Sequence, residues 1–483
     1  MGTGAQIVGS IFNEVSHHGT QIGVLDVDVI EAAKTGRPDA TRLFYARAPA
    51  AGGGLYMFAP STGTGGTGGQ GGTGGTGGTG GTAGAGGVAG TGGAAGTGGA
   101  GGRGGSGGTT GSGGTTGSGG TIGSVCRPGA GGTGGAAGAS PCPGAIVLTA
   151  SSYRSQGNGT SSVAVGDVTK DGRLDIAIAN RSSGTYSIMA QGFAGTVYIV
   201  QPNPTSIAIG DLDRDGRGDL LVTGLAGVVQ VARSNGDGTF SGGGSYTTGA
   251  GAQYVKIADF DGDGDQDFAV ACATDNKVMM YVNEDGKALF NQHFTTAAEP
   301  GTSAEATGDL NCDGRIDLVT SSASAGSVSV FMNVGGGRFA DRVTYAAGAA
   351  AHSVAVGDLN GDGAPDLAVA NTTAGTVGVY LNNGDGTYAS PTTFPAGTTP
   401  LGLVLADLNG DGKLDAAVAS STGTGVSVLM GGGDGTLAAP VTTAAAQNFQ
   451  FMTSADYNGD GRPDLITANG DNNVTAFFTT CAP

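Results

Sequence analysis

The sequence of 483 residues has no tryptophan and few charged side chains, since Asp, Glu, Lys and Arg together make up 12% of it. Only 21 residues are basic, against 39 acidic ones, and no cluster of Lys or Arg occurs. Binding to a phosphate backbone requires such a cluster, which argues against nucleic acid as a partner. No run of about 18 apolar residues occurs either, so we expect no segment that spans a membrane.

The first 60 residues lack the features of an export signal. Met1 opens MGTGAQIVGSIFNEV rather than a basic region followed by a long apolar run. This part combines a candidate strand, Gln21 to Ile30, with a short helix or turn, Glu31 to Thr41, and an apolar end, Leu55 to Pro60. We interpret residues 1–60 as either a small accessory unit or the remnant of a domain that begins outside this reading frame.

Glycine is in large excess, with 101 residues, and 41 of them lie in residues 61–140. That stretch has no Asp or Glu and only two basic residues, Arg103 and Arg127. It cannot bury enough apolar surface to offset the entropy lost on ordering, which predicts a flexible spacer over residues 61–141. As a random coil, 80 residues would span roughly 50 Å. A packed array of polyglycine II helices is the alternative.

The rest of the chain, residues 142–483, contains an internal repeat. The pattern Asp-x-(Asp/Asn)-x-Asp-Gly-x-x-Asp occurs with Thr at the third position in its first copy, and successive copies start 44 to 50 residues apart. We number these nine-residue segments loop 1 to loop 7, and they begin at Asp167, Asp211, Asp259, Asp309, Asp358, Asp407 and Asp456. Near-equal spacing indicates that each repeat is one supersecondary unit.

Four candidate strands make up each unit. Before the loop comes an apolar stretch such as Ser162 to Asp167, and after it an alternating one such as Leu174 to Asn180. A third strand follows a polar turn, as in Thr376 to Asn382, and the segment Asn383 to Tyr388 turns the chain into a fourth. Four antiparallel strands are typical of a propeller blade, so the predicted fold is all-β, with seven four-stranded blades.

Large and small residues alternate in the second strand of a blade, which would let neighbouring blades stack closely. Ile176 and Ile178 should face one neighbour, and Ala177 and Ala179 the other.

The ring can be closed by the strand at the start of this region. After loop 7 only two strands remain, Asp464 to Ala468 and Asn473 to Phe478, so that blade lacks its outer strand. The stretch Ala145 to Tyr153 would supply it.

This closure would bring Cys481 beside Cys142, where we expect a disulfide. A Cys142–Cys126 pair and free thiols throughout are the alternatives, and five cysteines cannot all pair within one chain. Cys272 falls in a strand and Cys312 in a loop, with no metal-ligand spacing between them.

The repeated loops have the composition of calcium sites. Oxygen-bearing side chains at positions 1, 3, 5 and 9, with glycine at position 6 for a sharp turn, suit a hard cation that takes six to eight oxygen ligands. Position 7 would contribute a backbone carbonyl, so its side chain should be unconstrained. Asx-turns without metal are the alternative reading of any single loop. The expected ligands are Asp167, Thr169, Asp171, Arg173 and Asp175; Asp211, Asp213, Asp215, Arg217 and Asp219; Asp259, Asp261, Asp263, Asp265 and Asp267; Asp309, Asn311, Asp313, Arg315 and Asp317; Asp358, Asn360, Asp362, Ala364 and Asp366; Asp407, Asn409, Asp411, Lys413 and Asp415; and Asp456, Asn458, Asp460, Arg462 and Asp464.

Charge supports a role for up to seven Ca²⁺ ions. The loops hold 24 of the 39 acidic residues, and fourteen positive charges would reduce the net charge from −18 to −4. Without metal, each loop forces like charges together. Loop 1, with neutral Thr169 at position 3, should be the weakest site.

The core Gly-Asp-Leu-Asn-Gly-Asp-Gly-x-x-Asp and the later Leu-Asn-Asn-Gly-Asp-Gly-Thr-Tyr, Leu381 to Tyr388, resemble the FG-GAP/VCBS repeat family. The resemblance covers residues 145–483. It implies an integrin-α-like seven-bladed propeller that binds calcium at the loop residues named above. It also implies a secreted or cell-surface bacterial protein, although no signal peptide is visible.

A propeller fold does not fix a function. We expect a monomeric, non-catalytic binding or adhesion module for an extracellular protein or glycan, presented on the glycine-rich spacer. A calcium-dependent lectin is the alternative, with Tyr254, Tyr281, Tyr345 and Tyr380 as candidate sugar contacts.

A propeller-type lyase or hydrolase is a weaker alternative. Only four histidines occur, and none has a convincing catalytic partner: His17 and His18 precede the propeller, His293 lies in an outer region, and His352 precedes a strand. Most acids that could act as a general acid and base belong to the loops.

Overall fold

The computed structural model describes residues 44–47, 55–58, 141–142, 145–190, 196–200, 203–422, 425–444 and 448–482. The expected strand Gln21 to Ile30, the turn Glu31 to Thr41 and the glycine-rich stretch 61–140 lie outside these residues. In the N-terminal part, β1 (Phe44–Arg47) and β2 (Leu55–Phe58) pair as an antiparallel hairpin. None of the described residues belongs to a helix long and apolar enough to cross a membrane.

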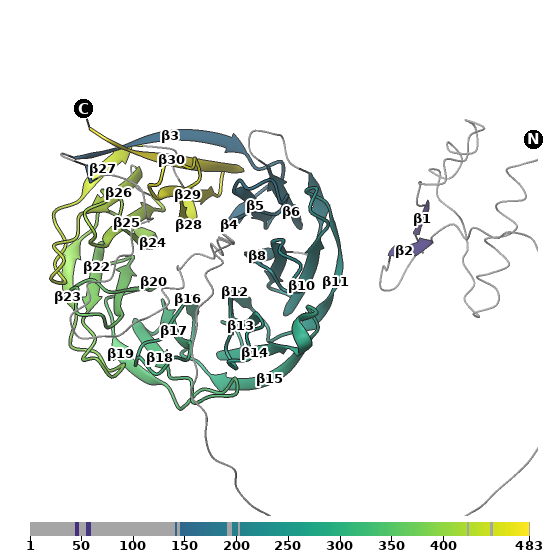
Figure 1. Cartoon of the computed structure of the whole chain (residues 1–483), viewed down its shortest axis with the longest axis horizontal. Coiled ribbons are helices and arrows are strands. Elements are labelled where there is room, and N and C mark those ends of the chain that lie inside the picture. Colours follow the sequence, from purple (N-terminus) through teal and green to yellow (C-terminus); the bar gives the residue numbers. More distant parts are fainter. Residues whose placement is uncertain are drawn as a thin grey trace, which may run out of the picture. The chain divides into compact units, whose positions relative to one another are not determined.

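The C-terminal part is a ring of seven four-stranded antiparallel sheets, as the repeat predicted (Figure 1). Blades 1 to 3 are β4 (Thr160–Gly166), β5 (Asp175–Asn180), β6 (Thr185–Met189) and β7 (Val197–Ile199); β8 (Pro204–Gly210), β9 (Asp219–Gly224), β10 (Val228–Ser234) and β11 (Phe240–Thr247); and β12 (Ala252–Ala258), β13 (Asp267–Cys272), β14 (Lys277–Asn283) and β15 (Phe290–Ala297). A 3₁₀ turn, η1 (Glu284–Gly286), joins β14 to β15.

Blades 4 to 7 repeat this order. They are β16 (Thr302–Gly308), β17 (Asp317–Ser322), β18 (Ser327–Phe331) and β19 (Val343–Ala346); β20 (Ala351–Gly357), β21 (Asp366–Asn371), β22 (Thr376–Tyr380) and β23 (Thr392–Pro395); β24 (Pro400–Ala406), β25 (Asp415–Ser420), β26 (Gly425–Leu429) and β27 (Val441–Ala444); and β28 (Phe449–Ala455), β29 (Asp464–Asn469), β30 (Asn473–Cys481) and β3 (Ile146–Arg154).

The last blade closes the ring in the predicted way. The outer strand β3 comes from the start of the region and pairs with β30 in an unbroken register from Ile146 opposite Cys481 to Arg154 opposite Asn473. A disulfide joins Cys142 to Cys481, with the two Cα atoms 5.2 Å apart. The expected pairing is therefore confirmed, and the Cys142–Cys126 alternative is wrong.

The other cysteines differ in state. Cys272, at the end of β13, is a buried free thiol. Cys312, in loop 4, is disulfide-bonded, so free thiols throughout are also ruled out. Cys126 lies outside the described residues.

The core lies between the blades, and the second strands supply its two faces as expected. Ile176 and Ile178 pack with blade 7 residues such as Ile466, whereas Ala177 and Ala179 pack with residues of blade 2. Every residue of each second strand is buried. The alanine face lets the next blade approach closely. The isoleucine face fills the wider space toward the blade on the other side.

Candidate metal centres

All seven loops lie between the first and second strands of their blades, at the same end of the ring. The strand before each loop is apolar and innermost, and the loop's position 9 is the first residue of the buried second strand. Both ends of the loop are thus held by sheet.

The aspartate at position 1 organises the loop through backbone donors. In loop 2 the amides of Asp215 and Gly216 donate to the two carboxylate oxygens of Asp211, each at 3.0 Å. The glycine at position 6 makes this bond in every loop, at 2.8 to 3.0 Å. Its φ lies between +78° and +90°, a conformation that residues with a β-carbon rarely adopt, which is why glycine is repeated there.

Position 5 fixes the far side of the loop. Its carboxylate accepts a bond from the amide of position 7 in all seven copies, at 2.8 to 3.0 Å. The carbonyl of position 7 takes no part in this bond. The side chain at this position is Arg in four loops and Asp, Ala or Lys in the other three.

The carboxyl group at position 9 is completely buried in every copy. One of its oxygens accepts the amide of position 2, as in the 2.9 Å bond from Phe260 to Asp267. In loops 2 to 7 the other oxygen accepts an amide at the end of the third strand, as in the 2.8 Å bond from Asn283 to Asp267. Burial raises the pKa of Asp267 to about 7 and that of Asp317 to about 6.

Two loops bring three carboxyl groups close enough to hold one ion. Ligand oxygens of Asp211, Asp213 and Asp215 lie within 4.8 Å of one another, and those of Asp259, Asp261 and Asp267 do the same. The Oδ1 atom of Asp213 is buried and has no hydrogen-bond partner. A buried carboxylate oxygen without a donor is destabilising, and a cation at this point would remove the cost, so the residues fit a metal ion.

In loops 4 to 7 an asparagine replaces the aspartate at position 3. Its side-chain amide donates to the position 5 carboxylate, as in the 2.9 Å bond from Asn311 to Asp313. Its side-chain oxygen accepts a hydrogen bond from the backbone amide of position 5, as from Asp313 to Asn311. These two bonds hold the asparagine side-chain oxygen next to the position 5 carboxylate. Because asparagine is neutral, loops 4 to 7 each have one negative charge fewer than loop 2.

Loop 1 and loop 3 depart from the common pattern. In loop 1 the hydroxyl of Thr169 donates to Asp175 at 3.0 Å, and the Oδ1 atom of Asp175 has no hydrogen-bond partner. In loop 3 position 7 is Asp265, whose side chain is 4% exposed and forms an ion pair with Arg214 of loop 2. The side chain at position 7 is therefore not unconstrained in every loop, because Asp265 in loop 3 links that loop to loop 2.

Each of loops 1 to 5 is also tied to the next blade through the backbone carbonyl of its position 2. The side chain of Asn283 donates to Leu212 O at 2.7 Å, and Asn333 and Asn382 make the same bond one and two blades later. Ser234 Oγ and the amide of Gly435 serve loops 1 and 5. This role of the asparagine was not predicted from the sequence, although Asn283 directly precedes the turn between the third and fourth strands of its repeat.

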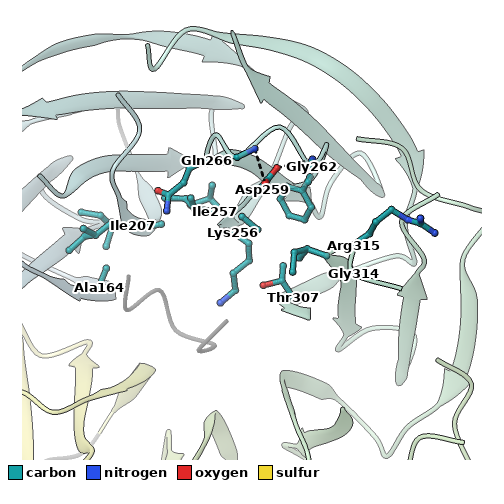
Figure 2. Close-up of a pocket in the computed structure, with 17 residues that line it drawn as sticks. Ala164, Ile207, Lys256, Ile257, Asp259, Gly262, Gln266, Thr307, Gly314 and Arg315 are labelled. Carbon is teal, nitrogen blue, oxygen red and sulfur yellow. Dashed lines mark hydrogen bonds between the residues drawn. The ribbon is translucent and has the colours of Figure 1, made fainter. Parts of the chain in front are cut away.

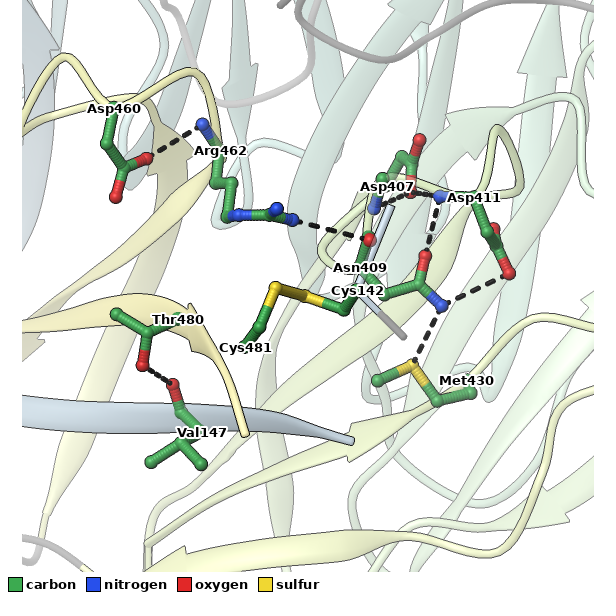
Figure 3. The surroundings of a disulfide bond; sticks show 11 residues. Cys142, Val147, Asp407, Asn409, Asp411, Met430, Asp460, Arg462, Thr480 and Cys481 are labelled. Carbon is green, nitrogen blue, oxygen red and sulfur yellow. Dashed lines mark hydrogen bonds between the residues drawn. A yellow bond between two sulfur atoms is a disulfide. The ribbon is translucent and has the colours of Figure 1, made fainter. Parts of the chain in front are cut away.

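Loop 6 is tied differently. The carbonyl of Asn409 accepts the amide of Cys142 at 2.8 Å and the guanidinium of Arg462 at 3.3 Å. Figure 3 shows the Cys142–Cys481 disulfide directly beside this loop.

The tyrosines considered as sugar contacts are mostly occupied by blade packing. Tyr281 is buried and stacks on Phe268, with ring centroids 4.6 Å apart. Tyr380 is fully buried and donates to Ala346 O at 2.9 Å. Tyr345 is half-buried, edge-on to another tyrosine ring. Tyr254 lines a narrow cavity at the centre of the ring.

The two histidines within the described residues have no acidic partner there. His293 lies on the outer strand β15 and contacts Gly336 O at 2.8 Å. His352 was expected just before a strand, but it is the second residue of β20, where burial lowers its pKa.

Family models match most of the ring. A model described as FG-GAP-like repeat matches residues 211–270, 259–320, 309–369, 358–418 and 407–467, and one described as FG-GAP repeat matches residues 159–200. No curated protein matches the chain in sequence.

Solved structures resemble the ring in fold. BBS1N in complex with ARL6DN matches with a TM-score of 0.51 in lead-soaked crystals, at 13% identity over 69% of this chain and 97% of that one. The mercury-soaked form gives 0.50, at 12% identity over 70% and 97%. A lectin from Agrocybe aegerita that recognises non-reducing terminal N-acetylglucosamine gives 0.42, at 20% identity over 68% and 87%.

Proposed function

Since the chain belongs to the FG-GAP repeat family, we propose that residues 142–483 form a calcium-stabilised, non-catalytic binding module outside the cell. Residues 61–141 serve as the spacer that presents it. Its ligand is an extracellular protein or glycan, and the module acts as a monomer.

The observation that carries this proposal is the sevenfold repetition of one oxygen arrangement. Positions 1 and 5 are locked by backbone amides in every loop, and position 9 is buried at the base. Calcium accepts such mixed carboxylate, carboxamide and carbonyl sets of six to eight oxygens. The proposed ligands are the residues expected from the sequence, with the side chain at positions 1, 3, 5 and 9 and the carbonyl at position 7.

Calcium would act mainly on stability. If each site had a Kd of about 0.1 mM in about 1 mM calcium, it would add roughly 1.4 kcal/mol, and seven sites roughly 10 kcal/mol. That total rivals the stability of a whole domain. Because each of loops 1 to 5 is hydrogen-bonded to the next blade, an ion that orders the loop also fixes the blade interface.

Thermal unfolding in millimolar calcium and in EGTA tests this, with millimolar magnesium as the matched control. We expect the melting temperature to rise by well over ten degrees with calcium and much less with magnesium, because Mg²⁺ demands stricter octahedral geometry. Equal melting temperatures in calcium and EGTA would show that the loops are Asx-turns without metal. Calorimetric titration then counts the sites, with seven as the expected upper limit.

The binding role needs a separate test. The full chain is screened on a glycan array and on immobilised extracellular-matrix proteins, in calcium and in EGTA. Saturable, calcium-dependent binding to either supports the module. No binding in either screen would leave the calcium sites intact as a finding and overturn the adhesion role.

A further inference from the structure

Loop 4 differs from the three loops that follow it at position 4. Positions 1, 3, 5, 6 and 9 are Asp, Asn, Asp, Gly and Asp in loops 4 to 7 alike. At position 4, loops 5 to 7 have glycine, whereas loop 4 has Cys312, which is disulfide-bonded. A covalent cross-link therefore enters loop 4 between two of its expected calcium ligands, Asn311 and Asp313.

The backbone at position 4 has a conformation that suits glycine. Its φ is +77° at Gly361, +75° at Gly410 and Gly459, and +63° at Cys312. A residue with a β-carbon adopts this left-handed conformation only at a cost in free energy. A cysteine therefore disfavours the loop conformation that glycine allows in loops 5 to 7. A disulfide offsets this disadvantage, because it reduces the number of other conformations that the loop can adopt.

The two ends of loop 4 are fixed, but its middle is less constrained. The carbonyl of position 2 accepts the side chain of Asn382 from the next blade, and the carboxyl group of position 9 is completely buried. Residues 313–315 are exposed, and Gly314 and Arg315 line a cavity of about 440 Å³ next to loop 3 (Figure 2). The middle of the loop therefore depends on a few hydrogen bonds and on the disulfide at position 4.

Cys312 also lies inside the hydrogen bonds that place the ligand side chains. The amide of Asp313 donates to Asp309 Oδ1 at 2.9 Å and to Asn311 Oδ1 at 3.2 Å. The side-chain amide of Asn311 donates to Asp313 Oδ2 at 2.9 Å. All three bonds span residue 312, so a change in its backbone conformation would disturb them together. The oxygens of positions 1, 3 and 5 thus depend on the conformation of the cysteine.

We propose that oxidation of Cys312 completes the calcium site of loop 4, so that this site binds calcium tightly only in the disulfide form. The proposal rests on the calcium role proposed above for the loops. Disulfides persist in oxidising surroundings outside the cell, so the site is complete only where the chain meets such surroundings.

A dithiol reverses this state. One of its thiolates attacks a sulfur of the Cys312 disulfide and breaks the S–S bond, and its second thiolate then closes a cyclic disulfide. The reagent loses two electrons and two protons, and two protein thiols form. Loop 4 then keeps a cysteine in the left-handed conformation without the link, and its calcium affinity falls.

Hydrogen–deuterium exchange of the full chain, followed by mass spectrometry, tests the proposal because its peptides report on each loop separately. Exchange in loop 4 is followed during a calcium titration with and without dithiothreitol. Loop 5, which has Gly361 at position 4, is the internal control. On reduction, we expect the calcium concentration for half-maximal protection to rise about tenfold in loop 4 and to stay within about twofold in loop 5.

Two variants separate the disulfide from the residue that forms it. Cys312→Gly copies loops 5 to 7 and should bind calcium at loop 4 as the oxidised parent does, with or without dithiothreitol. Cys312→Ser keeps a β-carbon and lacks the link, so it should match the reduced parent in both buffers. The thiol that either substitution leaves unpaired is capped with iodoacetamide. Dithiothreitol can also open the Cys142–Cys481 bond in all three proteins, so the parent is compared with the variants in each buffer.

The results distinguish this proposal from the calcium role itself. If calcium protects neither loop 4 nor loop 5 in any buffer, both the calcium role and the redox control are wrong. If calcium protects both loops but reduction leaves the loop 4 midpoint unchanged, only the redox control is wrong. The same holds if Cys312→Ser matches the oxidised parent, or if dithiothreitol shifts loop 4 of Cys312→Gly as much as that of the parent.

Discussion

Loop 3 and loop 1 are the two extremes of one motif. Loop 3 has five acidic residues, a position 9 carboxylate that accepts amides of the loop itself and of the third strand, and an ion pair to loop 2. Loop 1 has three acidic residues and a threonine at position 3. Both keep the same glycine conformation at position 6 and the same bond from its amide to the position 1 carboxylate. The backbone frame is therefore constant, while the number of charged oxygens and the ties to neighbouring elements vary.

The largest expected difference between the two loops lies at position 9. Asp267→Ala leaves the buried amides of Phe260 and Asn283 without an acceptor, so we expect it to lower the free energy of unfolding by about 3 kcal/mol. Asp175→Ala breaks no bond to a third strand, and a loss of about 1 to 2 kcal/mol is expected. Urea unfolding in calcium measures both, with exposed Asp341→Ala as control. Equal losses would contradict the comparison.

Exchanging the residue at position 3 between loop 1 and loop 3 should narrow the difference in calcium affinity between the two loops. Thr169→Asp adds a charged oxygen to loop 1, and Asp261→Thr removes one from loop 3. We expect each change to shift the Kd of its own site about tenfold, in opposite directions. Calorimetric titration at low calcium resolves the strongest and weakest sites. If neither variant changes the titration, position 3 does not contact the ion.

The stability of the metal-free protein and that of the calcium-bound protein should depend on pH in different ways. Burial raises the pKa of Asp267 and Asp366 to about 7, so the folded chain binds more protons than the unfolded chain between about pH 4 and 7. In EGTA, stability should therefore fall as the pH rises from 5.5 to 8.

In calcium the trend should flatten or reverse, because protons compete with the ion for the same carboxylates. Melting temperatures across this pH range, with and without calcium, measure the effect. A metal-free chain that becomes more stable toward pH 8 would show that these carboxyl groups are not desolvated.

The smallest expected effect concerns the ion pair between loops 2 and 3. Arg214→Ala leaves the buried carboxylate of Asp265 next to Asp263, and we expect a loss of about 1 kcal/mol. Asp265→Ala leaves only a half-exposed arginine, so its effect should stay within about 0.5 kcal/mol. Urea midpoints compare the two variants. An equal or reversed order would mean that Arg214 does not offset the charge of Asp265.

The sequence was sufficient for the ring because its spacing is regular and local. Seven loops, four strands per unit and the orphan strand β3 could all be counted along the chain. The hydrogen bonds between blades could not be predicted from the sequence, since Asn283 donates to a residue 71 positions earlier. Lys256 of β12 and Glu305 of β16 are a second example, since each looks ordinary in its own strand and only the packing of blade 3 against blade 4 brings the two charges near each other.

Ring closure also determines how the protein would carry a mechanical load. A pull applied at Cys142, just before β3, would load the pairing of β3 with β30. Without the disulfide, that force would peel β3 from β30 one hydrogen bond at a time. With it, the force passes through a covalent bond to Cys481 and is shared along the length of β30. The seam of the ring is thus shielded from tension that is applied at this end of the propeller.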